Sequence, residues 1–468
     1  MQSLYKHSAC HLVDLIRTKA LSPRELMEET LKRIESINPL LNAFVALRAD
    51  QAMEEAGELE AQMAAGQVPG PLAGIPIGVK DLEDVQGMVT SFGSIPYAHH
   101  RVEYDSIQVA RLKAAGAIVV GKTNTPEFGF TGFTKNRLYG VTRNPWNLEH
   151  TPGGSSGGSA AAVSSGMVPV ATGSDAGGSI RIPAAYSGCF GFKPTYGTIP
   201  LGPVELLHMT RTWTLGPLTR TVADAALYLD CTAGYHPADP QSLPGPGFSW
   251  LDTLSHLPSA LKIGFSPTLG YARVDEEILT LVEKAVNIFE TMGHHVELWQ
   301  GRLPEVTEAW NKMMSFELYG QVHQDLERIR PELGRTLAAS LDQAKRMTCQ
   351  DHLKNQKARS EFNLALQGYF DRYDLLLTPT MPTEAFAAKG PPPTEIDGQS
   401  VPLLWAVAFT YPFNLSGHPA ATVRAGLTRA GLPAGLQMIG PRHRDERVLQ
   451  AAYAYEQETG WNLQWPKL

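Results

Sequence analysis

Two glycine- and serine-rich elements lie close together in the chain and have a composition suited to acyl-transfer chemistry. They are residues 153–158, GGSSGG, and residues 175–179, DAGGS. Asp175 is the only ionised side chain between positions 151 and 180, which is not typical of a solvated linker. Glycine permits close approach of the backbone, and consecutive glycine amides before a serine can direct N–H groups at one point. An oxyanion could form at such a point.

A lysine at the end of an apolar run is the candidate base. Lys80 follows residues 75–79, IPIGV, which predict a strand that carries the amine into the interior. A serine hydroxyl is a poor nucleophile until a base takes its proton, and a lysine can be that base only when it is neutral. Burial lowers the pKa of a lysine from its ordinary value of about 10.4. Asp81 would favour the charged form, but adjacent strand residues point to opposite faces.

Each of these residues also has a purely structural interpretation. Lys80 and Asp81 could form a solvated strand end, and Ser155 could be a hydroxyl in a turn. Ser179 could cap a helix that follows it. The joint occurrence of the three residues with several flanking motifs favours the catalytic interpretation.

The combination resembles the amidase signature family of hydrolases. Lys80, Ser155 and Ser179 match the catalytic positions of that family, and the interval between the two serines also matches. Ser174 is a departure, because many members have threonine there, but the hydroxyl group remains. Further matching segments are residues 180–185, 191–197, 216–224, 377–380, 414–419 and 431–437. The resemblance therefore covers nearly the whole chain.

The resemblance implies a role for each residue around these elements. Ser179 would be the nucleophile, and Ser155 would relay its proton to Lys80, the general base. The bond between Gly154 and Ser155 would be a cis peptide bond. The backbone N–H groups that would hold the substrate oxygen are those of Ala176, Gly177, Gly178 and Ser179. The supporting residues are Gly154, Ser174, Asp175 and Arg181.

The same resemblance implies a serine amidase that uses neither a metal nor another cofactor. It would cleave the carbon–nitrogen bond of a small linear amide, anilide or carbamate, with aryl acylamidase, esterase or urethanase activity conceivable. Two apolar stretches, residues 201–213 and 402–413, are candidates for the substrate pocket, although their residues could equally belong to the core. The large apolar side chains in question are Leu206, Met209, Trp213, Leu404 and Trp405.

An alternative function within the same resemblance is the glutamine-hydrolysing component of a tRNA-dependent amidotransferase complex. Such a component needs charged groups to hold the two ends of glutamine. Residues 398–412 contain no ionisable side chain except Tyr411, and they lack the acidic segment expected of such proteins. We therefore expect an amidase that acts on its own as a monomer or homodimer.

Residues 116–123, GAIVVGKT, satisfy the expression for a phosphate-binding loop. Such a loop follows a strand and opens a helix. Here residues 105–115 predict a helix that stops at Gly116, and residues 117–120 predict the strand itself. The sequence therefore argues against a nucleotide site.

Residues 153–157 also satisfy the G-x-S-x-G pattern of the α/β-hydrolase nucleophile elbow. An elbow requires a strand immediately before it. The preceding residues 144–152 contain Pro145 and Pro152 and no apolar run, so they do not predict a strand. This leaves Ser179 as the favoured nucleophile.

Composition limits the other classes of function. The chain has 468 residues, of which 43% are hydrophobic, and its net charge of −7 gives no reason to expect nucleic-acid binding. The cysteines stand alone and suggest neither disulfides nor a metal site; they are Cys10, Cys189, Cys231 and Cys349. Because no run of 18 apolar residues and no signal-like start occurs, we expect a cytoplasmic protein without membrane spans.

The elements that must position these residues alternate between helix and strand, which predicts the α/β class. Residues 22–25, SPRE, predict a capped helix start, and residues 262–265, 274–292 and 294–298 predict a strand, a helix and a strand. Residues 232–260 read as a linker within one domain, 1–468. The resemblance implies the amidase signature fold, a large mixed and mostly parallel sheet flanked by helices on both faces. It also implies a partly helical variable region, about 300–375, over the active site.

Overall fold

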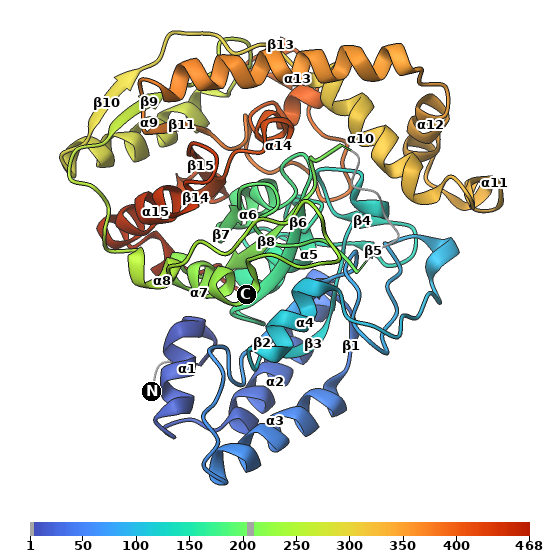
Figure 1. Cartoon of the computed structure of the whole chain (residues 1–468), viewed down its shortest axis with the longest axis vertical. Coiled ribbons are helices and arrows are strands. Elements are labelled where there is room, and N and C mark those ends of the chain that lie inside the picture. The colour runs from blue at the N-terminus through green and yellow to red at the C-terminus, as the bar shows by residue number, and fades with distance from the viewer. Residues whose placement is uncertain (1–3, 204–209) are drawn as a thin grey trace.

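The structure, a computed structural model, describes residues 4–203 and 210–468 (Figure 1). Its centre is an 11-stranded sheet with the order β1-β3-β2-β6-β8-β7-β14-β15-β11-β9-β10. The strands of this sheet are β1 Phe44–Leu47, β2 Pro76–Lys80, β3 Ile118–Thr123, β6 Val170–Asp175, β7 Phe190–Lys193, β8 Thr214–Thr219, β9 Lys262–Phe265, β10 His295–Leu298, β11 Leu375–Pro379, β14 Ala420–Leu427 and β15 Pro433–Ile439. Two small hairpins complete the strands, namely β4 Lys135–Asn136 with β5 Gly140–Val141, and β12 Glu395–Ile396 with β13 Gln399–Ser400.

The sheet is mixed, which confirms the predicted α/β class. Parallel pairing occurs in two blocks, β3-β2-β6 towards one end and β11-β9-β10 at the other. The strands between the blocks, β6 to β11, are joined by antiparallel pairs, and β1 pairs antiparallel with β3. Parallel pairing is therefore confined to the two blocks, one of which contains Lys80.

Helices lie on both faces of the sheet, as the resemblance implied. The helices are α1 Ala9–Arg17, α2 Pro23–Leu41, α3 Ala49–Ala64, α4 Ile107–Ala114, α5 Gly157–Ser164, α6 Arg181–Ser187, α7 Val222–Thr232, α8 Trp250–Thr253, α9 Glu276–Thr291, α10 Thr307–Val322, α11 Leu326–Ile329, α12 Arg335–Ala344, α13 Cys349–Phe370, α14 Tyr411–Ser416 and α15 Asp445–Thr459. Strand side chains alternate between the two faces. In β3, Val119 accordingly packs in a cluster with α4 and α7, whereas Val120 packs in a cluster with α2, α3 and α5.

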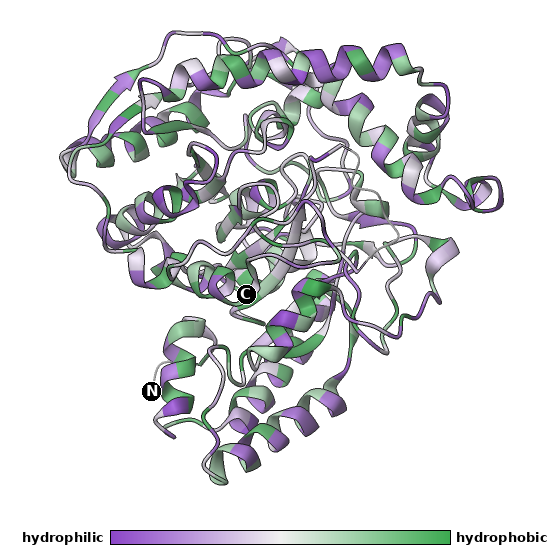
Figure 2. Cartoon of the chain, in the orientation of Figure 1, coloured by the Kyte–Doolittle hydropathy of each residue, from purple (hydrophilic) through white to green (hydrophobic). Residues whose placement is uncertain are grey.

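Most of the elements that the sequence predicted are present. Helix α2 begins at Pro23 with the predicted capping box, in which Ser22 and Glu25 bond each other's backbone N–H. Strand β9 has the predicted bounds, while helix α9 is slightly shorter than predicted and β10 begins one residue later. The buried side chains of α9 recur at helical spacing, and the peripheral helices carry both hydrophobic and hydrophilic residues (Figure 2).

Residues 232–260 pack against the body of the protein. Arg111 of α4 donates hydrogen bonds to the carbonyls of Thr232 and Gly234, at 2.6 and 2.9 Å. Strands from both sides of this stretch, such as β8 and β9, belong to the same sheet. Nothing in this arrangement requires more than one domain, and the single-domain organisation stays our prediction.

The helical region predicted near residues 300–375 contains α10, α11, α12 and α13, which lie together at one end of the molecule (Figure 1). Helix α10 packs on α12, α13 and α14. We call α10 to α13 the helical cover. None of the helices within the described ranges is long and apolar enough to cross a membrane.

The structure argues against the two alternative motifs, the phosphate-binding loop and the nucleophile elbow. Gly116 follows helix α4 with a positive φ of 95°, and the residues after it form β3, so no phosphate-binding loop is present there. Residues 144–152 form turns, in which the Asn144 N–H donates to the carbonyl of His150 at 2.9 Å. No strand therefore leads into Ser155, as a nucleophile elbow would require.

Candidate active site

Lys80 lies at the end of β2, where its amine reaches two serine hydroxyls. Its Nζ donates hydrogen bonds to Ser155 Oγ at 2.7 Å and to Ser174 Oγ at 2.9 Å. Lys80 is fully buried, and Ser155 is 2% exposed. Ser174 belongs to β6, the parallel neighbour of β2, and Ser155 lies just before α5, which packs on both strands. The fold thus brings three of the predicted site residues together.

The surroundings of Lys80 favour its neutral form. Burial lowers the pKa of its amine to about 7, although the negative charges of Glu83 and Asp175 act in the opposite direction. The Asp81 carboxylate faces Lys122 instead, with 3.2 Å between Oδ1 and Nζ, as the alternation of strand residues predicted. A substantial fraction of the Lys80 amine is therefore able to accept a proton near neutral pH.

A second buried group beneath Lys80 was not predicted from the sequence. The Lys80 backbone N–H donates to Thr172 Oγ1 at 3.0 Å, and this hydroxyl donates to Glu83 Oε1 at 2.9 Å. Gln108 donates to the other oxygen of Glu83. Burial raises the pKa of Glu83 to about 7. No motif marks a buried carboxyl in the loop after a strand, so the sequence contains no signal for Glu83.

The segment that carries Ser155 has the geometry that the resemblance implied. The peptide bond between Gly154 and Ser155 is cis. A Cβ atom on Gly154 would lie 2.7 Å from the backbone N of Phe133, so no side chain fits there. The Ser156 N–H donates to the carbonyl of Ser179 at 3.1 Å, which places the two glycine- and serine-rich elements side by side.

An ion pair anchors the second element. Arg181 Nη2 lies 2.9 Å from Asp175 Oδ1, and both side chains are fully buried. Burial alone would raise the pKa of Asp175, but the Arg181 charge holds it well below its usual range. Arg181 also donates to Gln437 Oε1 and Asn414 Oδ1, both at 2.6 Å.

The Asp175 carboxylate also accepts backbone N–H groups from the turn that follows it. Gly178 N–H donates to its Oδ1 at 2.6 Å, and Ile180 N–H donates to its Oδ2 at 3.1 Å. This corrects one prediction: the Gly178 N–H is not free for a substrate oxygen, because the side chain three residues earlier accepts it. Such local bonds are typical of aspartate in turns.

The carbonyl groups of the same turn are held from distant segments. Asn414 Nδ2 donates to the Asp175 carbonyl at 2.8 Å, and Thr410 Oγ1 donates to the Gly177 carbonyl at 2.7 Å. Neither residue was predicted to take part in the site. Asn414 stands in a segment that matched the family, so a signal existed. Thr410 lies in residues 402–413, which were predicted as a candidate pocket segment for their large apolar side chains.

Three predicted donors remain available in this turn. In the part of the chain that the structure describes, the N–H groups of Ala176, Gly177 and Ser179 have no hydrogen-bond acceptor. The Ser179 side chain itself is only partly buried, unlike Ser155. The arrangement can therefore present a hydroxyl and several N–H donors at one accessible place.

The predicted pocket residues are only partly accounted for. Trp213 is half-buried and precedes β8, whose first residue, Thr214, pairs with Asp175. Leu404 and Trp405 are half-buried in the short 3-10 helix Leu403–Val407, and the Trp405 ring meets that of Tyr271 edge-on, 6.1 Å between centroids. The predicted pocket residues Leu206 and Met209 lie outside the described residues.

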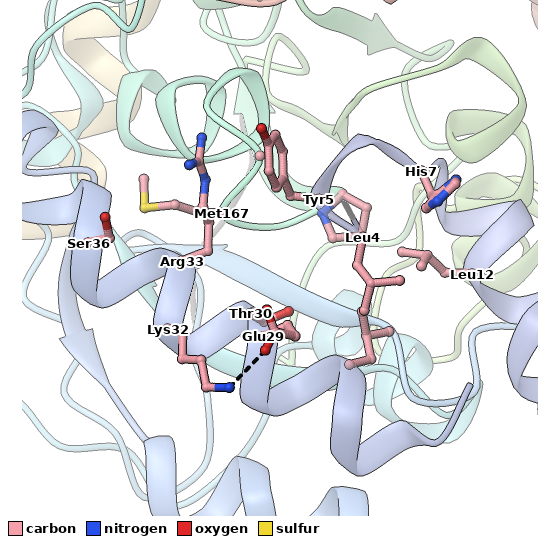
Figure 3. Close-up of a pocket in the computed structure, with 13 residues that line it drawn as sticks. Leu4, Tyr5, His7, Leu12, Glu29, Thr30, Lys32, Arg33, Ser36 and Met167 are labelled. Atoms are coloured by element: carbon pink, nitrogen blue, oxygen red, sulfur yellow. Dashed lines mark hydrogen bonds and ion pairs between the residues drawn. The ribbon is translucent and has the colours of Figure 1, made fainter. Parts of the chain in front are cut away.

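A cavity of about 350 Å³ lies elsewhere, between the N-terminal segment and α2 (Figure 3). Its lining includes Tyr5, Arg33 and Met167 but none of the predicted site residues. The Arg33 guanidinium donates to the Ser165 carbonyl at 2.8 Å and lies over the Tyr5 ring. Within the described ranges, no group of three or more His, Cys, Asp or Glu side chains is placed to hold a metal ion.

Comparison with known proteins agrees with this geometry. A family model described as Amidase matches residues 25–449. An acylamidase of Rhodococcus erythropolis is 36% identical over 474 residues, which cover 98% of this chain and 97% of that protein. A glutamyl-tRNA(Gln) amidotransferase subunit of Acaryochloris marina is 37% identical over 478 residues, covering 96% and 98%.

Solved structures agree as well. The crystal structure of a bacterial aryl acylamidase of the amidase signature enzymes superposes with a TM-score of 0.92 at 34% identity, covering 97% of this chain and 96% of that chain. The glutamyl-tRNA(Gln) amidotransferase subunit from Thermotoga maritima gives a TM-score of 0.79 at 28% identity, covering 100% and 98%. Sequence, fold and site agree, and we conclude that the chain belongs to the amidase signature family and is an amide hydrolase.

Proposed function

We propose that the protein is a serine amidase that cleaves small amides, and in particular anilides, through an acyl-enzyme. The observation that carries this proposal is the bond of 2.7 Å between Lys80 Nζ and Ser155 Oγ in a fully buried setting. A lysine whose pKa is lowered to about 7 has a neutral fraction that can act as a base.

In the proposed reaction, Ser179 Oγ attacks the carbonyl carbon of the substrate. Its proton passes to Ser155 Oγ while the Ser155 proton passes to Lys80 Nζ, so the base ends protonated. The N–H groups of Ala176, Gly177 and Ser179 stabilise the oxyanion. When the carbon–nitrogen bond breaks, Ser155 gives its proton to the leaving amine and takes one back from Lys80, because Ser179 Oγ is now bonded to the acyl carbon. Water then attacks the ester of Ser179 in the same way and releases the acid.

The preference for anilides rests on relatives and on the nearby side chains. The R. erythropolis relative is an acylamidase, and the structural relative with a TM-score of 0.92 is an aryl acylamidase. Trp213 and Trp405 are half-buried aromatic residues in segments that lead to the site. Aromatic side chains of this kind suit a substrate with an aryl group beside its scissile bond.

The second candidate is the glutamine-hydrolysing component of an amidotransferase complex. It is favoured by one observation, the 37% identity to the A. marina amidotransferase subunit over almost the whole chain. Against it, residues 398–412 offer no charged group that could hold an end of glutamine. We therefore propose that the chain acts without partner subunits, as a monomer or homodimer.

The test uses the purified chain alone with a chromogenic anilide such as 4-nitroacetanilide. We expect hydrolysis by the wild type and by Ser259→Ala, an exposed-serine control, and none by Ser179→Ala. A serine-directed fluorophosphonate should label the first two proteins and not the third. Loss of labelling in Ser155→Ala with retention in Ser179→Ala would instead make Ser155 the nucleophile. Hydrolysis of glutamine that appears only with added amidotransferase partner subunits would support the second candidate.

A further inference from the structure

A tryptophan of the helical cover contacts the turn that carries Ser179. Trp310 lies in α10, and its indole Nε1 donates to the carbonyl of Ala176 at 2.8 Å. Its ring is stacked on that of Tyr411, the first residue of α14, with 4.8 Å between centroids and 19° between planes. The indole is thus held by a neighbouring ring while its N–H bonds the turn.

The carbonyl that Trp310 bonds controls the direction of one N–H group. The Ala176 carbonyl and the Gly177 N–H belong to one planar trans peptide unit, so they point in opposite directions. Holding the carbonyl towards Trp310 therefore aims the Gly177 N–H away from it. In the described part of the protein this N–H has no acceptor, and it is one of the donors proposed for the oxyanion.

Close packing makes this contact specific. A Cβ atom on Gly177 would lie 2.2 Å from Trp310 Cζ2, so the indole can reach the backbone only because position 177 is glycine. The neighbouring peptide units are held differently, since Asn414 and Thr410 bond the carbonyls of Asp175 and Gly177. The carbonyl between these two, that of Ala176, is bonded by Trp310 of the helical cover.

We propose that Trp310 is a positioning residue that aims the Gly177 N–H at the substrate oxygen by holding the Ala176 carbonyl. This inference rests on the proposed function, because it assumes that the oxyanion forms at this turn. Helix α10, which carries Trp310, also packs on α12 and α13. Through the Trp310 hydrogen bond, the helical cover would therefore influence the rate of the chemical step.

Trp310→Phe tests the inference, because it keeps an aromatic ring against Tyr411 and removes the N–H. The matched control is Trp250→Phe. Trp250 is 5% exposed in α8, and its Nε1 has no hydrogen-bond partner among the described residues. Replacing Trp310 with 3-benzothienylalanine, a sulfur analogue of tryptophan, removes the N–H with little change in shape. This second variant covers the case in which phenylalanine disturbs folding.

Three quantities are measured for each protein: kcat, KM and the inhibition constant of phenylboronic acid, which forms a tetrahedral adduct with a reactive serine. Loss of a whole oxyanion donor costs about 10²–10³ in rate, and a misaimed donor should cost less, about tenfold or more in kcat. We expect both Trp310 variants to show this loss, a similar rise in the inhibition constant and a KM within about twofold of wild type. Trp250→Phe should change none of the three.

Two results would overturn the inference. One is a kcat and an inhibition constant in both Trp310 variants that match those of Trp250→Phe. The other is a raised KM with unchanged kcat, which would make Trp310 a substrate contact. Failure of the proposed function looks different, because the wild type would then resist phenylboronic acid and Ser179→Ala would remain active.

Discussion

The ion pair at the buried site and the ion pairs on the surface of the helical cover have different surroundings. Around the site, Asp175 and Arg181 are both fully buried, and each makes several hydrogen bonds. In the cover, charged pairs such as Arg330 with Asp342 are partly exposed. Buried charges must be paired to be tolerated, whereas water and salt screen exposed ones. The site should therefore be intolerant of substitution, whereas the exposed charged positions of the cover should tolerate it.

The largest effect is expected at Lys80. Lys80→Ala should lower kcat/KM by about 10²–10⁴, the usual worth of a general base. Lys80→Arg should not restore activity, because a guanidinium stays protonated. In the wild type, kcat/KM should rise with pH as the amine loses its proton and level off above a pKa of about 7. A pH profile of kcat/KM with 4-nitroacetanilide checks this.

Lys80 would be only a structural cation if Lys80→Arg were active with an unchanged pH profile. A control for folding is needed, because a permanent charge at this buried position is destabilising. Lys80→Met keeps most of the volume without a charge, and it should be folded but inactive. Thermal unfolding of the three variants separates loss of the base from loss of the fold.

The next effect concerns stability and compares the two regions directly. Asp175→Asn leaves the Arg181 guanidinium buried without its counter-charge, and breaking a buried pair in this way costs about 3–5 kcal/mol. Urea unfolding should show this loss in the free energy of unfolding. If Asp175→Asn were as stable as the wild type, the ion pair would not be what holds the turn.

A smaller effect is expected at Glu83. Burial is the main cause of the lowered pKa of Lys80, and the charge of Glu83 opposes it. Glu83→Gln removes that charge and keeps an oxygen for Thr172, so the pKa of Lys80 should fall further. The rising limb of kcat/KM should then move to lower pH. The control is Glu55→Gln, because Glu55 pairs with Arg48 away from the site, and this variant should leave the rising limb of kcat/KM in place. If Glu83→Gln also left the limb in place, Glu83 and Lys80 would not be coupled.

The smallest effect is expected in the cover. Asp342→Asn weakens the exposed pair with Arg330, and the midpoint of thermal unfolding should hardly change. Any change should also fade when salt is added, because exposed charges are screened. A loss as large as that of Asp175→Asn would contradict the contrast between the two regions.

The sequence predicted the class of fold, and the family resemblance implied that Ser155 lies beside Lys80, because both residues stand in motifs with distinctive spacing. The hydrogen bond from Lys80 to Ser174 Oγ was not predicted, although Ser174 had been named as a supporting residue. The prediction that the Gly178 N–H is a donor for the substrate oxygen was wrong, because this N–H donates to the Asp175 side chain. An aspartate three residues before a turn N–H often accepts it, so the sequence did contain a signal for this bond. It could not have found Trp310. The pattern of a helix such as α10 shows which face is apolar, but it does not show which backbone carbonyl a side chain reaches.

The hydrogen bonds that join the turn after β6 to residues beyond position 400 have a consequence for biosynthesis. Asp175 and Asn414 are 239 positions apart, and the Thr410 and Gln437 partners also come late in the sequence. A nascent chain that ends before Thr410 already contains Lys80, Ser155 and Ser179, yet it lacks Thr410 and Asn414, which hold the carbonyls of Gly177 and Asp175. We expect the protein to gain its reactivity only after the segment that carries Thr410, Asn414 and Gln437 has been synthesised.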